Sequence, residues 1–278
     1  MDHDRRENRD DDDIGKLFSG LRDRDYAREG LFVCEGRLVI EKALAAGAGL
    51  RALVCVPSDE AMWRDALAAA GQPGISPRAM RRPEMEALVG FAFHRGAIAL
   101  AERPGPPPAS DAQAAGTQEA AATLTAAGNA LLLWNVTDPD NLGALIRSAA
   151  ALGAAAAYLG PGCADPLGRK ALRSSMGCAL SLSLRRVDSV EGLRAAGAML
   201  LAAALRPGAW GPRRARRELD ARGTGAILAL GNEGWGLPDD IVSACDAVVA
   251  LPMAGGVDSL NVGAAGAILM WELFGRFD

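Results

Sequence analysis

Three separated segments of the chain place polar side chains beside turns that contain proline or glycine. They are NVTDPDNLGALIRSAAALG at residues 135–153, AILALGNEGWGLPDD at 226–240 and VVALPMAGGVDSLNVGAAGAILMWELFG at 248–275. Amide, guanidinium, carboxylate and hydroxyl groups in such turns can bind a polar ligand and orient a reacting group. In each segment an apolar run precedes the turn and a helical pattern follows it. Each segment therefore predicts a strand, a turn and a helix.

The first segment indicates how these elements position its polar residues. Asp138-Pro139-Asp140 predicts the turn, because proline presets the backbone and aspartate can bond nearby amides. The apolar positions that follow recur at helical spacing and end at a glycine: Leu142, Leu145, Ile146, Ala149, Leu152 and Gly153. Asn141 and Arg147 lie outside this apolar stripe, so both can face a polar ligand. The alternative is a buried strand–helix unit with a solvated arginine.

The glycine-rich turns follow late strands and not the first one. After the first strand the chain reads TDPDN and has no G-x-G-x-x-G, which argues against an ordinary Rossmann dinucleotide site. The glycines of Gly231–Gly236 and Gly255–Gly256 allow backbone groups to approach a ligand closely. The alternative is that these glycines only make tight turns.

Together, and in this order, the three segments resemble the signature motifs of the SpoU family of RNA 2′-O-ribose methyltransferases, in the SPOUT superfamily. The motifs NxxDPxNLGxxxR, GNEGxGLP and LPMxGxxxSLNV carry the resemblance, which covers residues 129–278. It implies an α/β fold, in which a small α/β substrate-binding domain precedes a parallel-sheet domain with a trefoil knot. It also implies S-adenosylmethionine-dependent methylation of a ribose 2′-hydroxyl in RNA, with ribosomal RNA favoured over transfer RNA.

The resemblance assigns functional roles residue by residue. The residues that match the family's catalytic set are Asn141, Arg147, Glu233, Ser259 and Asn261. The loops that bind S-adenosylmethionine in relatives, largely through the main chain, correspond here to Leu230, Gly231, Asn232, Gly234, Leu251, Met253 and Leu260. Family members often continue SLNV with serine, whereas this chain has Gly263, and a small residue there still permits close helix packing.

Several of these roles have alternatives. Ser259 is a favoured helix N-cap type, and capping could be its whole role. Its hydroxyl and the Asn261 amide could instead hold the substrate ribose or the helix that carries Arg147. Glu233 is an unusual residue for turn-making alone and could orient Asn141 or a ligand hydroxyl. In relatives the arginine that matches Arg147 has been proposed as the base. A free guanidinium has a pKa above ~12, which favours a phosphate clamp and leaves the proton's route open.

The overall charge does not predict RNA binding, so local clusters must supply it. The chain has 30 Lys and Arg against 34 Asp and Glu, and the acidic tail of residues 1–13 carries the whole difference of −4. We expect this tail to be disordered. The residues that we expect to contact RNA phosphates are Arg169, Lys170, Arg173, Arg213 and Arg214, and other clusters add Arg78, Arg81, Arg82, Arg206, Arg216 and Arg217.

Cysteines and histidines exclude several classes of site. The 5 cysteines have no CxxC spacing, which indicates a reducing cytoplasm and neither a disulfide frame nor a zinc site. The 2 histidines, His3 and His94, leave little for a metal or histidine-base mechanism, and no metal is expected. The chain shows no apolar signal region and no run near the ~18 apolar residues of a membrane span. A cytoplasmic protein is expected.

The remaining patterns divide the chain into regions. Residues 14–102 alternate strand and helix patterns, and FVCEGRLVIEKAL resembles the substrate-binding domain of SpoU enzymes, although an undedicated α/β module is the alternative. Residues 103–128, rich in Pro, Ala and Gly, predict a linker. In residues 129–278 we expect strands at 130–136, 155–159, 182–187, 199–205, 225–231 and 247–252.

The resemblance further implies a homodimer. The apolar last helix, with Met270, Trp271, Leu273 and Phe274, is compatible with an interface but equally with a core. Two rival functions remain at this stage. One is a catalytically inactive RNA-binding protein that retains the SPOUT fold, and the other is a doubly wound enzyme that acts on a small phosphorylated metabolite.

Overall fold

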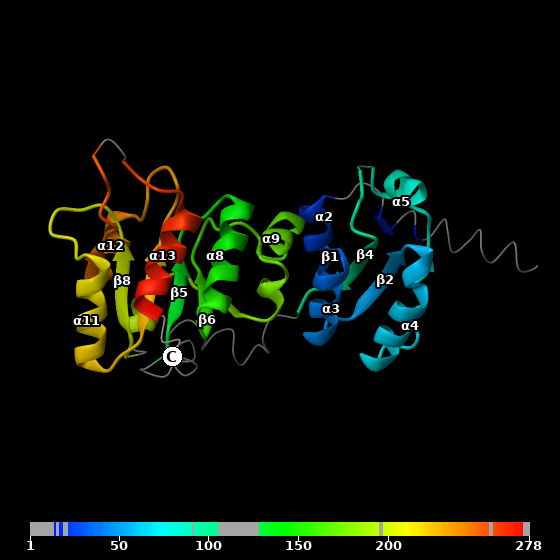
Figure 1. Ribbon diagram of the computed structural model, residues 1–278, viewed down its shortest axis with the longest axis horizontal. Helices are drawn as coiled ribbons and strands as arrows, with labels where there is room; N and C mark the ends of the chain where they lie inside the picture. Colours follow the sequence, from blue (N-terminus) through cyan, green and yellow to red (C-terminus); the bar gives the residue numbers. More distant parts are fainter. Residues whose placement is uncertain are drawn as a thin grey trace, which may run out of the picture. The chain divides into compact units, whose positions relative to one another are not determined.

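The computed structural model describes Ile14, Leu17 and Phe18 and residues 22–90, 92–104, 128–194, 197–255 and 258–274 (Figure 1). The chain divides into two compact units, one of Met1–Gly105 with Leu167–Arg173 and one of Pro106–Pro166 with Ser174–Asp278. The acidic tail of residues 1–13 and most of the expected linker lie outside the described residues. None of the helices in the described ranges has the length and apolar character needed to cross a membrane.

The amino-terminal unit is built on a mixed four-stranded sheet. Its strands have the order β1-β4-β2-β3, in which β4 is antiparallel to β1 and β2 and β3 is parallel to β2. The strands are β1 (Leu31–Glu35), β2 (Leu50–Cys55), β3 (Arg78–Ala79) and β4 (Ala97–Glu102). The helices are α2 (Asp23–Arg28), α3 (Arg37–Ala45), η1 (Pro57–Asp59), α4 (Glu60–Ala69) and α5 (Arg82–Val89). Helix α9 (Arg169–Ser174) comes later in the chain, and its residues up to Arg173 also belong to this unit. The short β3 and the helix α5 are not predicted by the sequence patterns.

The carboxy-terminal unit contains a six-stranded sheet in which every pairing is parallel. The strand order is β10-β8-β9-β5-β6-β7, so the first strand of this unit lies inside the sheet. The strands are β5 (Ala130–Leu133), β6 (Ala156–Leu159), β7 (Ser183–Arg186), β8 (Met199–Ala203), β9 (Ala226–Leu230) and β10 (Ala247–Val249). This arrangement confirms the predicted α/β class and its parallel carboxy-terminal sheet, whereas the knot stays a prediction.

All six expected strands are present, but they are shorter than the apolar patterns suggest. The clearest case is β5, which ends at Leu133 and not at residue 136. Asn135 adopts a φ of 56°, a left-handed conformation that cannot continue a strand. The chain turns there toward the next helix.

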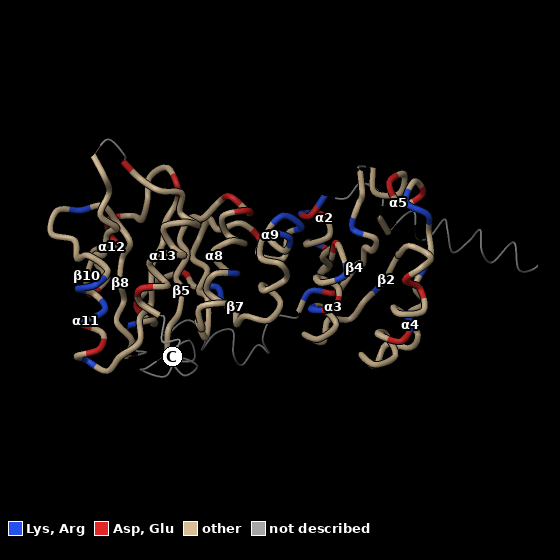
Figure 2. The backbone as a smooth tube through the Cα atoms, viewed as in Figure 1, with Lys and Arg blue, Asp and Glu red and all other residues tan. Residues whose placement is uncertain are grey.

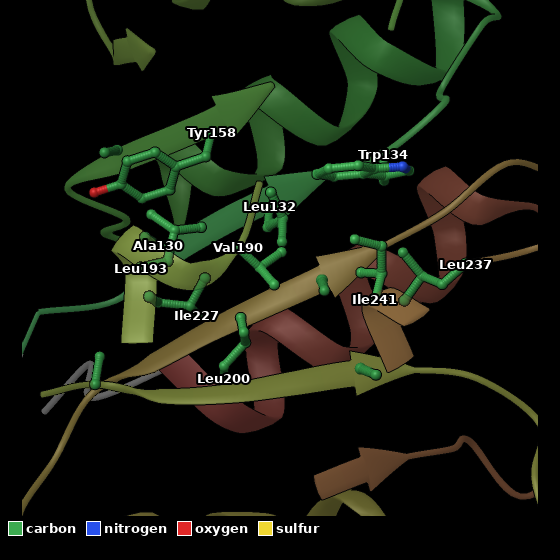
Figure 3. Packing of buried hydrophobic residues seen from close by; sticks show 14 residues of the cluster. Ala130, Leu132, Trp134, Tyr158, Val190, Leu193, Leu200, Ile227, Leu237 and Ile241 are labelled. Atoms are coloured by element: carbon green, nitrogen blue, oxygen red, sulfur yellow. The ribbon is translucent and has the colours of Figure 1, made fainter. Parts of the chain in front are cut away.

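Helices cover both faces of this sheet. On one face α10 (Glu191–Arg194) and α12 (Asp239–Ala244) enclose a core that includes Leu132, Trp134, Ile227 and Ile241 (Figure 3). On the other face α8 (Pro139–Ala151) packs beside α13 (Val262–Phe274), which also contacts α11 (Pro212–Arg222) (Figure 1). The short helix η2 (Cys178–Leu180) precedes β7. A continuous apolar sheet covered on both sides explains why its strands read as unbroken hydrophobic runs.

Helix α8 begins earlier than the sequence patterns predict. The side chain of Asp138 accepts hydrogen bonds from the backbone N–H groups of Asp140 (2.8 Å) and Asn141 (2.9 Å), so Asp138 is the N-cap. Pro139 occupies the first helical position, where its missing N–H is not needed. The expected bonding of an aspartate to nearby amides is present, but Pro139 and Asp140 of the expected turn already belong to the helix. Gly153, with a φ of 78°, follows the helix end as predicted.

Replacing Gly160 with alanine should destabilise the carboxy-terminal unit. A Cβ atom there would lie 2.3 Å from Cε3 of Trp134, whose indole is part of the core. Overpacking of this kind costs about 1–3 kcal/mol of unfolding free energy. Urea unfolding followed by tryptophan fluorescence measures it. Gly211→Ala is the matched control, because a Cβ atom there meets nothing within 4 Å. Equal unfolding midpoints for the two variants would contradict the packing described here.

Candidate functional site

The loops that follow β8, β9 and β10 enclose a cavity of about 420 Å³. These three strands are parallel neighbours in the sheet, so their carboxyl ends open onto the same edge. The cavity is lined by residues 203–206, 230–237, 249–251 and 253 and by residues 259–269 in part. All of the residues expected to bind a cofactor line it: Leu230, Gly231, Asn232, Gly234, Leu251, Met253 and Leu260.

The loop after β9 is tightly closed. Asn232 and Gly236 exchange two backbone hydrogen bonds, of 3.1 and 2.9 Å, which leave Glu233, Gly234 and Trp235 at the tip. A Cβ atom at Gly231 would lie 2.3 Å from the carbonyl carbon of Gly236, so only glycine fits there. The loop is therefore compact, and its tip residues line the cavity.

Asn232 anchors this loop to the connection between β5 and α8. Its side chain is buried, and its Nδ2 donates to the carbonyl oxygen of Asn135 at 2.9 Å. Its Oδ1 accepts from the backbone N–H of Gly234 at 2.8 Å. The side chain that we expected to contact a cofactor thus acts as a structural link between two motifs. Asn232 nevertheless lines the cavity.

Three of the expected catalytic residues form one chain of hydrogen bonds. The Nδ2 of Asn261 donates to the Oδ1 of Asn141 at 2.9 Å, and the Nδ2 of Asn141 donates to the Oε1 of Glu233 at 2.8 Å. The three residues come from the three separate motifs. The structure therefore supports the interpretation that Glu233 orients Asn141 and that the Asn261 amide holds the helix carrying Arg147.

The direction of this chain is fixed by the start of α13. The Oδ1 of Asn261 accepts from the backbone N–H groups of Gly263 (2.9 Å) and Ala264 (3.3 Å), which can only donate. The Nδ2 of Asn261 must then donate to the Oδ1 of Asn141, and the Nδ2 of Asn141 must donate to the carboxylate of Glu233. Asn261 and not Ser259 caps α13, because the helix begins at Val262, and the alternative in which Ser259 serves only as a cap is wrong.

Ser259 and Arg147 occupy different places. Ser259 is exposed and lines the cavity, as does Glu233. Arg147 is exposed on α8 and does not line the cavity of this chain. Gly263 lies at the contact of α13 with α8, where a Cβ atom would be 3.6 Å from that of Ala144. The small residue in place of the family's usual serine thus sits at a close helix contact.

The basic residues expected to contact RNA differ in their surroundings. In the amino-terminal unit Arg169 pairs with Asp23 at 2.8 Å and with Glu35 at 3.3 Å. Two carboxylates already match its charge, which disfavours the expected phosphate contact. On the same helix Lys170 is exposed and Arg173 is partly buried.

The other expected phosphate contacts lie at the start of α11. Basic residues recur along α11 (Figure 2). Arg213 and Arg214 are exposed there, and the guanidinium carbon of Arg214 lies 4.7 Å from the centroid of the Trp210 ring. Arg216 forms an ion pair with Asp220 at 2.9 Å. The exposed cations of α11 are therefore the better placed of the two groups for contact with an anionic partner.

The described residues offer no metal site and no activated thiol near the cavity. Among them no group of three or more His, Cys, Asp and Glu side chains is placed to hold a metal ion. Burial raises the pKa of the Cys163 thiol, which donates to the carbonyl oxygen of Leu133 at 3.3 Å. A thiol held protonated in this way is a poor nucleophile. The polar groups at the cavity are instead suited to binding and orienting hydroxyl groups.

Sequence reasoning missed one wall of the cavity. Residues 203–206, at the end of β8 and directly after it, line the cavity, and Arg206 there pairs with Asp239. Trp235 also lines the cavity and was not singled out. The available signal for the missed wall was the apolar run of β8 itself, which becomes informative only once β8 is known to lie beside β9.

Known proteins resemble this chain in sequence. An uncharacterized tRNA/rRNA methyltransferase of Mycobacterium tuberculosis is 33% identical, over 88% of this chain and 81% of the relative. A 23S rRNA guanosine 2′-O-methyltransferase of Bacillus subtilis is 36% identical over 55% of this chain and 60% of the relative.

Solved structures resemble the fold. The SpoU methyltransferase AviRb of Streptomyces viridochromogenes, in complex with AdoMet, has a TM-score of 0.70 and 26% identity, and the match covers 94% of this chain and 96% of AviRb. An AdoMet-bound rRNA methyltransferase of Sinorhizobium meliloti has a TM-score of 0.75 at 24% identity, over 94% and 92% of the two chains. The latter likeness is one of fold.

The family model described as the SpoU rRNA Methylase family matches residues 128–271, which include all three motifs and every strand of the parallel sheet. The relatives and the solved structures agree with this match. The chain therefore belongs to the SpoU family of RNA methyltransferases, as its motifs predict.

Proposed function

We propose that this SpoU family member methylates a ribose 2′-hydroxyl of RNA, with ribosomal RNA favoured over transfer RNA, and that the cavity described above holds its S-adenosylmethionine. The single observation that carries the proposal is the convergence of the three motifs on one cavity. Two of them line its wall, and the third supplies Asn141, which is bonded to the other two.

The cavity suits the proposed cofactor in size and lining. Its volume of about 420 Å³ lies within the usual range of small-molecule sites, ~300–1,000 Å³. Leucine side chains and backbone groups of closed loops form much of its wall, which fits an adenosine and a methionine tail. When bound, the sulfonium group supplies an electrophilic methyl. The protein's own task is to hold a hydroxyl in line with that methyl.

Glu233 is the group best placed to orient that hydroxyl. Its Oε1 is occupied by Asn141, and its side chain lies on the cavity wall. A carboxylate has two oxygens and accepts several hydrogen bonds, so the second oxygen can accept from a ribose hydroxyl. Because Asn141 fixes the carboxylate, the acceptor is positioned before the substrate arrives. The exposed hydroxyl of Ser259 can add a second polar contact.

We assign Arg147 to the phosphate next to the reacting ribose. Its guanidinium is exposed and presents a planar set of donors that matches phosphate oxygens. A positive charge there would stabilise the alkoxide character that develops as the 2′-hydroxyl loses its proton. Arg213 and Arg214 on α11, with Lys170 and Arg173, are proposed as further phosphate contacts.

A homodimer is also part of the proposal. Ile268 and Trp271 are exposed apolar side chains on α13, whereas Met270, Leu273 and Phe274 on the same helix are buried. The helix thus supplies both the core and an apolar outer face, and a second copy of the chain would cover that face. Sedimentation of the purified protein measures its association state.

Transfer of labelled methyl groups is the direct test of the proposed activity. The purified protein should transfer label from S-adenosylmethionine to RNA taken from host cells that lack the gene. Mapping of ribose methylation with and without the gene then identifies the nucleotide. Binding of S-adenosylmethionine without any transfer would instead indicate the inactive RNA-binding protein. Label in a small phosphorylated metabolite and not in RNA would overturn the proposal.

Asn261→Asp should separate the capping role of this residue from its role in the hydrogen-bond chain. The aspartate keeps oxygen acceptors for the N–H groups of Gly263 and Ala264 but has no donor for Asn141. We expect near wild-type stability and a fall in methyl transfer of about 10-fold or more, as for the loss of one hydrogen bond. Asn261→Ala should lose activity and about 1 kcal/mol of unfolding free energy. Wild-type turnover of Asn261→Asp would show that the chain is not needed.

Arg147→Ala should abolish methyl transfer while S-adenosylmethionine binds normally. Removal of one preorganised group that stabilises developing charge typically costs about 100- to 1,000-fold in rate. Arg147→Lys keeps the charge and loses the planar fork, so it should recover only part of the activity. Initial rates with labelled cofactor compare methyl transfer by the wild type and the two variants, and equilibrium dialysis compares their binding of S-adenosylmethionine. Near wild-type turnover of Arg147→Ala would dispose of the assigned role.

A further inference from the structure

We propose that Trp235 is a positioning residue for the RNA substrate: its indole stacks on the base of the nucleotide whose ribose enters the cavity. The inference rests on the proposed function and adds to it the means by which the base is held. It is carried by the place of Trp235 at the tip of the closed loop after β9.

Trp235 is exposed although hydrogen bonds close the loop that carries it. The indole residue is 72% exposed, the most of any large hydrophobic side chain among the described residues. Two backbone hydrogen bonds between Asn232 and Gly236 close the loop around it, and Asn232 fastens the loop to the β5–α8 connection. Exposure of so large an apolar side chain to water is unfavourable, and the closed loop holds the indole in that exposed position. Exposed aromatic groups of this kind mark binding surfaces.

The surroundings of Trp235 favour a flat, apolar face as its partner. Two more exposed hydrophobic side chains line the same cavity, Leu205 (57% exposed) and Leu260 (41% exposed). Among the residues that line the cavity the cation is Arg206, and its charge is matched by Asp239. The residues that line the cavity therefore offer exposed apolar side chains but no unmatched cation for a phosphate. The π-face of a nucleobase meets these conditions, whatever its sequence identity.

The chemistry of the reaction places a base at this position. The reacting hydroxyl is on C2′ of the ribose, and the base is attached to the neighbouring carbon, C1′. Glu233, which we assign to a ribose hydroxyl, is two residues before Trp235 in the same closed loop. A ribose that reaches Glu233 inside the cavity leaves its base near the opening. An exposed indole there can stack on the base, and the stack removes one face of each ring from water.

A series of substitutions at Trp235 tests the assignment. Trp235→Ala should lower kcat/KM for methylation of RNA from cells lacking the gene by about 10- to 100-fold, mainly through KM, as for loss of one stacked base. Trp235→Phe should recover most of the loss, because a phenyl ring also stacks. Trp235→Leu is the matched control, since it is apolar but not aromatic, and should resemble alanine. S-adenosylmethionine binding should be unchanged throughout.

Each other outcome overturns the inference in a recognisable way. If Trp235→Ala weakens cofactor binding as much as methylation, the indole covers the cofactor and not a base. If Trp235→Leu matches the wild type, apolar contact alone suffices. If Trp235→Ala changes the sedimentation coefficient, Trp235 contacts a second copy of the chain. Absence of methyl transfer by the wild-type protein would remove the proposed function itself, whereas active wild type with unaffected variants removes only the role of Trp235.

Discussion

The site depends on one directed chain of hydrogen bonds that begins at the backbone of α13. The N–H groups of Gly263 and Ala264 can only donate, so they fix the orientation of Asn261, which fixes Asn141 and then the carboxylate of Glu233. The two linking groups are neutral amides and do not titrate. The same asparagine thus caps the helix and orients the site, because the amides that need a cap supply the orientation that the carboxylate needs.

Close approach of α13 to α8 makes this chain geometrically possible. A Cβ atom at Gly266 would lie 2.3 Å from Cδ2 of Leu145 and 2.8 Å from Cδ1 of Leu230. Glycine at that position lets the two helices approach closely enough for Asn261 to reach Asn141. The parallel sheet supplies the other constraint, because strands that run in one direction deliver their following loops to one edge. Residues far apart in sequence then meet without long connections.

The sequence predicts the strands and the residues that line the cavity better than it predicts the contacts between side chains. The six strands, and seven residues that line the cavity, were recognisable because apolar runs and motif spacing are local signals. The ion pair of Arg169 with Asp23 could not be recognised from the sequence, because the two residues lie far apart in the chain and no local pattern connects them. Asn232 illustrates the same limit. Its motif indicated a cofactor contact, whereas its amide in fact joins two loops.

The distribution of charge in this protein constrains how it can recognise an acidic polymer. Residues 1–13 carry the net charge of −4, and the rest of the chain is neutral. Several arginines also form ion pairs within the fold, such as Arg206 with Asp239 and Arg216 with Asp220. Long-range attraction is therefore weak and cannot select a nucleotide. Selection must come from short-range contacts at the cavity, where exposed apolar side chains such as Trp235 and Leu205 lie beside polar ones such as Glu233. A stacked base, as proposed for Trp235, supplies such a contact without requiring an unmatched charge. The exposed guanidinium groups of Arg147 and α11 keep the separate role that we propose for them, contact with phosphates of the backbone.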